Sequence, residues 1–162
     1  PFRSIVLLVQ EEFAERMSMK EGPASAGPLG LSLWLDFEVL VDMRVPSSSF
    51  SPSPRVNSRL ISLLPIERPE IKSNFNRRLF RTIAKHCFAN RRRKMRTLLS
   101  TVPRRISRVK DWHKDRWNAA SSAILDSKIE GMPEDWLNLR PENLETTHWV
   151  ILAGTFSSIY QE

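Results

Sequence analysis

The hydrophobic period of this sequence changes at a short linker, and that change limits what the chain can fold into. Before the linker, residues 37–45 alternate apolar and polar side chains, which is typical of a half-buried strand. Beyond the linker, apolar residues recur at every third or fourth position, which is typical of amphipathic helices. Pro65 and Pro69 bracket the linker itself. We therefore predict two domains, residues 1–66 and residues 67–162.

The continuous apolar run at residues 4–9 indicates an α/β fold class for the first domain. Such a run is typical of a strand buried on both faces of a parallel sheet, because helices then cover both sides. A helix is expected over residues 10–19, with Phe13, Ala14 and Met17 facing the core. The other predicted elements are strands over 37–45 and 56–64 and helices over 29–35, from residue 74 onward, and over 111–125, 133–139 and 145–159. The predicted core residues of the second domain are Phe75, Leu79, Ile83, Cys87, Met95, Leu98, Leu99, Trp112, Trp117 and Ile124.

Cysteine and histidine are too sparse to support a disulfide or a metal site. Cys87 is the only cysteine, which excludes an intramolecular disulfide and favours a reducing compartment. The three histidines are dispersed and lack the spacing of metal ligands. No apolar run approaches the roughly 20 residues that cross a bilayer. We expect an intracellular protein without a membrane partner, in the cytoplasm first and in a mitochondrion or plastid as the alternatives.

Positive charge is concentrated in residues 68–110. This segment holds fifteen basic residues and one acidic residue, Glu70, which gives it a net charge of +14. The whole chain has a net charge of +7, so the remainder is net −7. A charge run is ordinarily a solvated helix face, but this near absence of acids favours a surface that binds nucleic-acid phosphates, of either RNA or DNA. The basic residues that we predict to bind are Arg77, Arg81, Lys85, Arg91, Arg92, Arg93, Lys94, Arg96, Arg104 and Arg105.

Two groups of these cations have a spacing that favours binding. Arg77, Arg81 and Lys85 recur at every fourth position, which places them on one side of a helix, away from the apolar stripe that contains Leu79. Residues 91–96 crowd five cations into about one and a half helical turns. Such crowding is self-repulsive, and phosphate groups would relieve it while releasing their own counterions.

The most specific segment of the chain is residues 45–58, with the sequence VPSSSFSPSPRVNS. Its prolines at positions 46, 52 and 54 fix the backbone φ angle and lower the entropy of the loop. Phe50 is therefore expected to be held in one orientation, in which its ring can stack on a base. Taken alone, an aromatic residue in such a position is more often a plug of the core.

Three motifs in order carry a family resemblance. The pattern V-P-x-S-x-F-x-P-x-P-x-V-x-S at residues 45–58 is preceded by Q-x-E-x-A-x-R at residues 10–16 and followed by F-x-x-R-R-R-K-x-R-x-L at residues 88–98. Together they resemble the ribosomal RNA small-subunit adenine N6,N6-dimethyltransferase family of the KsgA type. The resemblance covers nearly the whole chain and weakens after about Lys110.

The resemblance implies a fold and a function. Residues 1–66 would be the distal half of a Rossmann-like methyltransferase sheet, and residues 67–162 a small helical domain that engages small-subunit ribosomal RNA. The family transfers methyl groups from S-adenosylmethionine to the N6 amines of two adjacent adenines near the 3′ end of that RNA. By the same resemblance, Phe50 would stack on the target adenine, with Pro52 and Pro54 as the scaffold of its loop.

The sequence departs from the family pattern where the cofactor would bind. The glycine-rich turn, the acidic residue for the cofactor ribose and the Asn-Leu-Pro-Tyr-like motif have no counterpart in it. Because the sequence starts at Pro1 without Met, we expect upstream sequence to be missing, and S-adenosylmethionine and activity to need that N-terminal half as a partner. The alternatives are a non-catalytic RNA-binding ribosome-assembly factor and a mitochondrial transcription factor of the same family.

Overall fold

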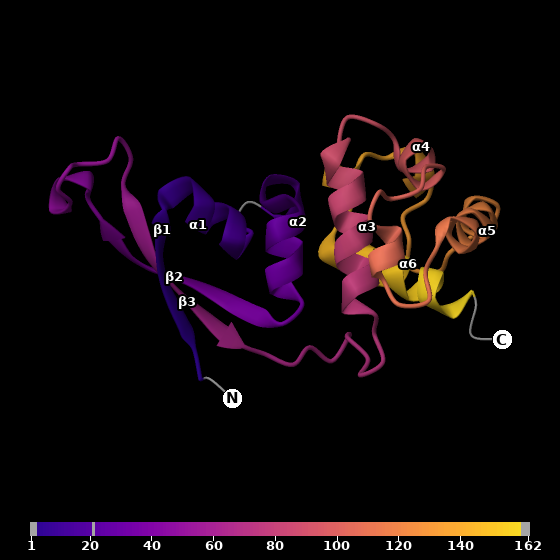
Figure 1. Cartoon of the computed structure of the whole chain (residues 1–162), viewed down its shortest axis with the longest axis horizontal. Coiled ribbons are helices and arrows are strands. Elements are labelled where there is room, and N and C mark those ends of the chain that lie inside the picture. Colours follow the sequence, from indigo (N-terminus) through magenta and orange to yellow (C-terminus); the bar gives the residue numbers. More distant parts are fainter. Residues whose placement is uncertain (1–2, 21, 160–162) are drawn as a thin grey trace. The chain divides into compact units, whose positions relative to one another are not determined.

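The computed structural model describes residues 3–20 and 22–159, and Pro1 therefore lies outside the described residues. The chain divides into two compact units, residues 1–71 and residues 72–162. Figure 1 shows the three strands in the first unit and a set of helices in the second. Among the described residues, no helix combines the length and the apolar character that crossing a bilayer requires.

Three strands, β1 (Ile5–Gln10), β2 (Phe37–Val45) and β3 (Ser58–Pro65), form the sheet of the first unit. Their order is β1-β3-β2, and both neighbouring pairs are antiparallel. The parallel sheet expected from the first apolar run is therefore wrong for the described residues. A continuous apolar run indicates burial, whereas strand direction depends on a partner far along the chain, since Ile5 pairs with Leu63.

One face of the sheet carries the core of this unit. The helices α1 (Glu11–Ser18) and α2 (Pro23–Trp34) pack together and cover that face. The buried residues between sheet and helices are Ala14, Met17, Ile61 and Leu63. On the opposite face, the side chains of Val6 and Leu8 are 57% and 48% exposed. Burial of β1 on both faces is therefore also wrong within the described residues.

The two helices of the first unit differ in detail from the expectation. Ala14 and Met17 are buried as predicted, but Phe13 is 42% exposed. Successive helical positions are about 100° apart, so Phe13 falls at the edge of the stripe that faces the sheet. α2 begins earlier than expected, at Pro23, because proline suits the first turn of a helix. Gly27, with a φ of 59°, interrupts the helix.

Helices and short 3₁₀ turns make up the second unit. The helix that the sequence predicts over residues 133–139 is reduced to one 3₁₀ turn, between two prolines that limit its length. The elements described in this unit are α3 (Arg77–Ala89), α4 (Met95–Leu99), η2 (Ile106–Arg108), α5 (Lys114–Leu125), η3 (Trp136–Asn138), η4 (Pro141–Asn143) and α6 (Thr146–Ser158).

The core of the second unit is aromatic and follows the predicted periodicity. Trp117 and Phe156 stack with their ring centroids 4.6 Å apart. Phe75 precedes α3 and is half-buried, with its ring centroid 5.8 Å from that of Phe80, so its place in the core is only partial. The predicted core residues that are buried are Leu79, Ile83, Cys87, Met95, Leu98, Leu99, Trp112, Trp117 and Ile124.

Side chains of α5 complete the C-terminal end of α4. The carbonyl of Leu99 would ordinarily accept from the backbone N–H four residues later, but that residue is Pro103, which has none. Instead, Nε1 of Trp117 donates to the Leu99 oxygen at 3.1 Å, and the hydroxyl of Ser121 donates to the same oxygen. This pair of hydrogen bonds fixes the point from which the chain continues into residues 102–108.

Candidate nucleic-acid interface

The serine- and proline-rich loop joins β2 to β3, so Phe50 lies near the tip of that hairpin. The loop opens with a single 3₁₀ turn, η1 (Ser47–Ser49). The carbonyl of Ser47 accepts from the Phe50 N–H at 3.2 Å and from Oγ of Ser53 at 2.9 Å. The N–H of Ser47 donates to Oδ1 of Asn57 at 3.2 Å. These bonds tie the loop to itself around Ser47 and leave the ring of Phe50 half-buried.

The two prolines predicted as scaffold lie beside Phe50 on this loop. Pro52 and Pro54 are both exposed, and the peptide bond between Ser51 and Pro52 is cis. Their rings fix φ at the second and fourth positions after Phe50. The exposure of Pro52 and Pro54 means that they act on the backbone of the loop and contribute little to the core of the unit.

An ion-pair cluster lies at the base of the same loop. The N–H of Glu11 donates to the carbonyl of Asn57 at 3.0 Å, which joins the start of α1 to the loop. The carboxylate of Glu11 accepts from Nε of Arg59 at 3.0 Å and pairs with Nε of Arg44 at 3.6 Å. Because Arg44 and Arg59 pair across β2 and β3, the carboxylate links both strands of the hairpin to α1.

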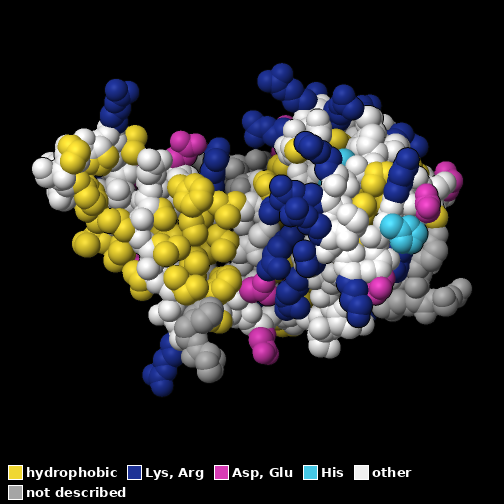
Figure 2. All heavy atoms as spheres, viewed as in Figure 1, with side chains coloured by type: hydrophobic (Ala, Val, Ile, Leu, Met, Phe, Trp, Pro, Cys, Tyr) yellow, Lys and Arg dark blue, Asp and Glu magenta, His cyan; other side chains and the backbone are white. Residues whose placement is uncertain are grey.

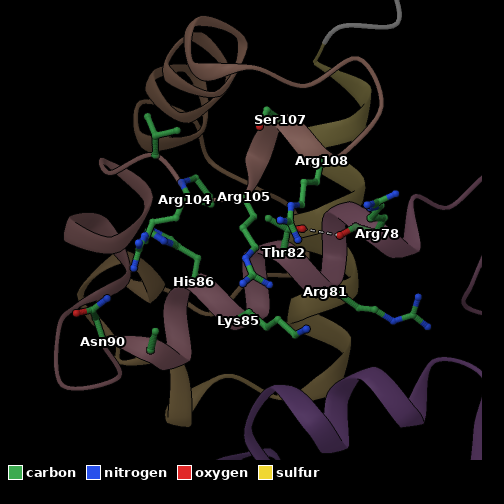
Figure 3. A pocket seen from close by; sticks show the side chains of 13 residues that line it. Arg78, Arg81, Thr82, Lys85, His86, Asn90, Arg104, Arg105, Ser107 and Arg108 are labelled. Carbon is green, nitrogen blue, oxygen red and sulfur yellow. Dashed lines mark hydrogen bonds between the residues drawn. The ribbon is translucent and has the colours of Figure 1, made fainter.

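A basic hollow of about 1010 Å³ lies in the second unit, between α3 and residues 102–108 (Figure 3). None of the thirteen described residues that line it is acidic. Without a carboxylate in the lining, the cations repel one another, and an anion that enters the hollow relieves that repulsion. The cations in the lining are Arg78, Arg81, Lys85, Arg104, Arg105 and Arg108.

His86 connects α3 to the segment that leads into the second wall of the hollow. Its Nε2 lies 2.8 Å from the carbonyl oxygen of Leu98 and 3.1 Å from Oγ1 of Thr101. Since α3 carries His86 and the chain runs from Thr101 directly into the second wall, these contacts fix the spacing of the walls. In Figure 3 the side chain of Arg105 extends from the second wall across the hollow toward α3.

The structure brings together part of the predicted basic set. Arg77, which we predicted to bind, is not among the residues that line the hollow. Arg78 and Arg108 line it, although they are not among the predicted binding residues. The spacing of Arg78, Arg81 and Lys85 is as helical as the spacing that we chose, so a wider stripe would have included Arg78. The predicted residues that line the hollow are Arg81, Lys85, Arg104 and Arg105.

The cations at residues 91–96 form a separate, exposed group. Arg91, Arg92 and Arg93 lie in a turn closed by a hydrogen bond from the Arg93 N–H to the carbonyl of Asn90 at 2.9 Å. Lys94 comes just before α4, and Arg96 lies within it. The expected crowding on successive helical turns is therefore wrong, although all five side chains are exposed. Figure 2 shows Lys and Arg side chains gathered over the helical unit.

Arg68, which opens the basic segment, has a structural role. Its Nε donates to the carbonyl of Trp34 at 2.5 Å, and its Nη2 donates to the carbonyl of Phe37 at 3.3 Å. The guanidinium carbon lies 4.2 Å from the centroid of the Trp34 ring, a cation–π contact. Arg68 thus fastens the linker to the first unit, and the charge count of the segment overstates the cations that face a ligand.

Cys87 lies on the inner face of α3 and is fully buried. Burial raises the pKa of its thiol well above the ordinary value, because the thiolate would lose its hydration. The side chain therefore packs as a small apolar group, in line with its place in the predicted stripe. Among the described residues, histidine, cysteine and acidic side chains form no group of three or more that could hold a metal ion.

The described geometry defines an α/β unit joined to a helical unit with a basic hollow, and comparisons place the chain in a family. The family model for ribosomal RNA adenine dimethylases matches residues 1–120. The ribosomal RNA small subunit methyltransferase A of Lactobacillus acidophilus is 32% identical over 94% of this chain and 45% of the relative. The protein of the same name from Nostoc punctiforme is 34% identical over 95% of this chain and 47% of the relative.

The chain belongs to the ribosomal RNA adenine dimethylase family. Its fold is similar to the crystal structure of a dimethyladenosine transferase from Plasmodium falciparum, with a TM-score of 0.62 and 21% identity. That likeness covers 93% of this chain and 56% of the solved chain. The chain thus spans about half the length of the curated relatives it matches.

S-adenosylmethionine, the cofactor that the family implies, does not fit the described residues. A glycine-rich turn for the cofactor does not follow β1. That strand ends at Gln10, and α1 begins at the next residue, Glu11. The first acid after that strand, Glu11, already pairs with Arg59 and Arg44 through its Oε1. The two basic walls in the second unit would repel a sulfonium ion. No catalytic step through the cofactor follows from these residues.

Proposed function

We propose that this chain is the target-base and RNA-binding part of an S-adenosylmethionine-dependent adenine N6,N6-dimethyltransferase of small-subunit ribosomal RNA. The observation that carries the proposal is the basic hollow of the second unit, whose described lining residues include six cations and no acid. Family membership adds the substrate class, because the matching relatives are named for the small-subunit ribosomal RNA.

Phe50 is the residue that contacts the target adenine in this proposal. Its half-buried ring sits on a loop that hydrogen bonds to Ser47 and Asn57 restrain from both ends. Such a ring loses little conformational entropy when a base stacks on it, and stacking contributes about 1–3 kcal/mol per base. Pro52 and Pro54 restrict the backbone of the loop and position the ring.

The basic side chains bind the phosphates of the RNA backbone in this proposal. Ten of them follow from the sequence, and the hollow adds Arg78 and Arg108. Arg suits this role because its planar fork of donors matches the oxygens of a phosphate group. The exposed side chains of Arg91, Arg92 and Arg93 provide a second contact surface in the same unit.

A partner of this chain is a complementary methyltransferase half that holds S-adenosylmethionine. The open face of the sheet supports this, because Val6, Leu8 and Leu40 are 57%, 48% and 40% exposed there. β1 also has no neighbouring strand on its outer edge among the described residues, which leaves backbone N–H and C=O groups to pair with a further strand. Assembly with that half would cover the apolar side chains and supply the cofactor, in a reducing compartment such as the cytoplasm.

Base stacking on Phe50 is tested with the 162-residue chain alone. The probe is a small-subunit ribosomal RNA hairpin in which 2-aminopurine replaces one of two adjacent adenines, because its fluorescence is quenched when it stacks. Binding should quench the probe, Phe50→Leu should abolish the quenching, and Phe50→Tyr should retain it. Phe13→Leu, which alters another partly exposed ring of the same unit, is the control. Equal quenching by the wild type and Phe50→Leu would refute the assignment.

Methyl transfer is tested by complementation. The chain is mixed with the part of the Lactobacillus acidophilus relative that it does not match, together with radiolabelled S-adenosylmethionine and undermethylated small subunits. If radiolabelled methyl groups appear in adenine only when both protein parts are present, the result supports the methyltransferase function. Tight RNA binding without any methyl transfer by the mixture favours the second candidate, a non-catalytic RNA-binding assembly factor, which the poor fit to the cofactor supports.

A further inference from the structure

The lining of the hollow between α3 and residues 102–108 is cationic and polar, and it contains no Phe, Trp or Tyr among its described residues. Sites that hold single-stranded RNA ordinarily place aromatic rings where successive bases stack. Trp117 and Phe156, two large aromatic residues of this unit, stack on each other and are buried in its core. The hollow therefore offers charge and hydrogen bonds without a stacking surface.

We infer that this hollow binds the sugar-phosphate backbone of double-helical RNA without reading its sequence. The inference rests on the proposed function and narrows its substrate at this site to the duplex form of RNA. In a double helix the bases are stacked inside and the phosphates lie outside, which matches a lining of cations. Arg78 and Arg108, one from each wall, belong to the site although the sequence pattern did not select them.

Both walls of the hollow contribute cations. Arg78, Arg81 and Lys85 line the hollow from α3, and Arg104, Arg105 and Arg108 line it from the opposite wall. In Figure 3 the side chain of Arg81 points away from that opposite wall. A phosphate strand between the two walls meets guanidinium groups on both sides, which is the geometry that neutralises several phosphates at once.

Polar residues between the cations favour RNA over DNA. The hydroxyl of Thr82 already donates to the carbonyl of Arg78 at 2.9 Å and keeps its acceptor capacity, while Ser107 and Asn90 are exposed at the lining. A ribose 2′-hydroxyl both donates and accepts, so it can bond to each of these groups. A deoxyribose offers no such partner, and the same duplex made of DNA should bind less tightly.

The test compares a variant of the hollow with a charge-matched control in the full chain. Arg78→Gln/Arg105→Gln removes one cation from each wall, and Lys114→Gln/Lys128→Gln removes two exposed cations of the same unit outside the hollow. Fluorescence anisotropy measures binding to two RNA duplexes of unrelated sequence, to their single strands and to the matching DNA duplex, over a range of KCl concentrations. Circular dichroism checks that each variant is folded.

The wild type should bind both RNA duplexes with similar affinity, and more tightly than the single strands or the DNA. The hollow variant should lose at least about tenfold in affinity for both duplexes. Its slope of log affinity against log salt should fall by about 2, because each phosphate contact contributes about 0.9. The control variant should keep most of its slope.

Other outcomes overturn the inference in distinguishable ways. Equal losses in the hollow and control variants would remove the hollow from the interface but leave RNA binding, and with it the proposed function, intact. Preference for single strands, or equal affinity for the DNA duplex, would refute the assignment to duplex RNA. A wild-type chain that binds no RNA would overturn both the inference and the proposed function.

Discussion

The two donors that share the Leu99 carbonyl should show a measurable dependence on each other. With Trp117 and Ser121 both present, the oxygen accepts two side-chain hydrogen bonds. Trp117→Phe removes one donor and Ser121→Ala the other, and in each single variant the buried carbonyl keeps a partner. In the double variant it has neither, and Pro103 has no N–H to replace them.

The size of the effect follows from these contacts. Each single variant loses a hydrogen bond whose net contribution is about 0.5–1.5 kcal/mol, and Trp117→Phe also leaves a small cavity. The double variant adds the cost of an unsatisfied buried carbonyl, about 1–3 kcal/mol. We therefore expect the double variant to lose at least about 1 kcal/mol more than the sum of Trp117→Phe and Ser121→Ala.

Urea unfolding followed by circular dichroism measures the free energy of unfolding for all four proteins of the cycle. Ser122→Ala is the control, because Ser122 is exposed on the same helix and reports the helix propensity of alanine alone. If the loss in the double variant equals the sum of the two single losses to within about 0.3–0.5 kcal/mol, the two donors act independently. The structural reason given for the end of α4 would then be wrong.

Three further predictions concern other contacts. Gly131→Ala should lower the free energy of unfolding by about 1–2 kcal/mol, because φ is +82° and the new Cβ would lie 2.8 Å from Cδ1 of Ile151. Arg68→Lys should destabilise the first unit by about 1–2 kcal/mol in urea unfolding, because an ammonium group cannot reproduce the two bonds and the contact with Trp34. The thiol of Cys87 should resist alkylation at pH 8 in the folded chain. Above pH 9, the ordinary pKa of this thiol, the free energy of unfolding should fall by up to about 1.4 kcal/mol per pH unit.

Each of these has an outcome that contradicts it. Unchanged melting of Gly131→Ala would mean that the turn adapts to a Cβ. A weaker affinity of Arg68→Lys for RNA at unchanged stability would make Arg68 part of the interface. The sign for Cys87 follows from its raised folded pKa, since only the unfolded chain loses the thiol proton near pH 9. A Cys87→Ala variant with the same loss of stability above pH 9 would assign that loss to other groups.

The sequence predicted the elements whose signal is local and missed the properties that depend on distant partners. The strand Phe37–Val45 was predicted with the observed bounds, because alternation at period two is carried by consecutive residues. The direction of β1 was not, because it is set by pairing with β3 across two intervening helices and a hairpin loop. The edge position of Phe13 likewise depends on how α1 is rotated on the sheet.

The same division applies to the basic surface. Cations of α3 were predicted from helical spacing, and Arg81 and Lys85 do line the hollow. The opposite wall is built from residues 102–108, where a proline removes any regular period, so nothing in the pattern reports that these residues face α3. His86 holds the segment just before this wall through Leu98 and Thr101, and sequence spacing does not encode such tertiary contacts. The roles of Phe50 and of the individual arginines stay predictions.

The central position of β3 governs the order in which the first unit can assemble on a ribosome. Within residues 3–20 and 22–159, β3 is the last strand in sequence order, and β1 and β2 each pair with it alone. Until Pro65 has left the exit tunnel, β1 and β2 lack the strand that joins them within this unit. The sheet of the first unit therefore cannot be completed before its central strand is made, and the apolar side chains that it buries stay exposed until then.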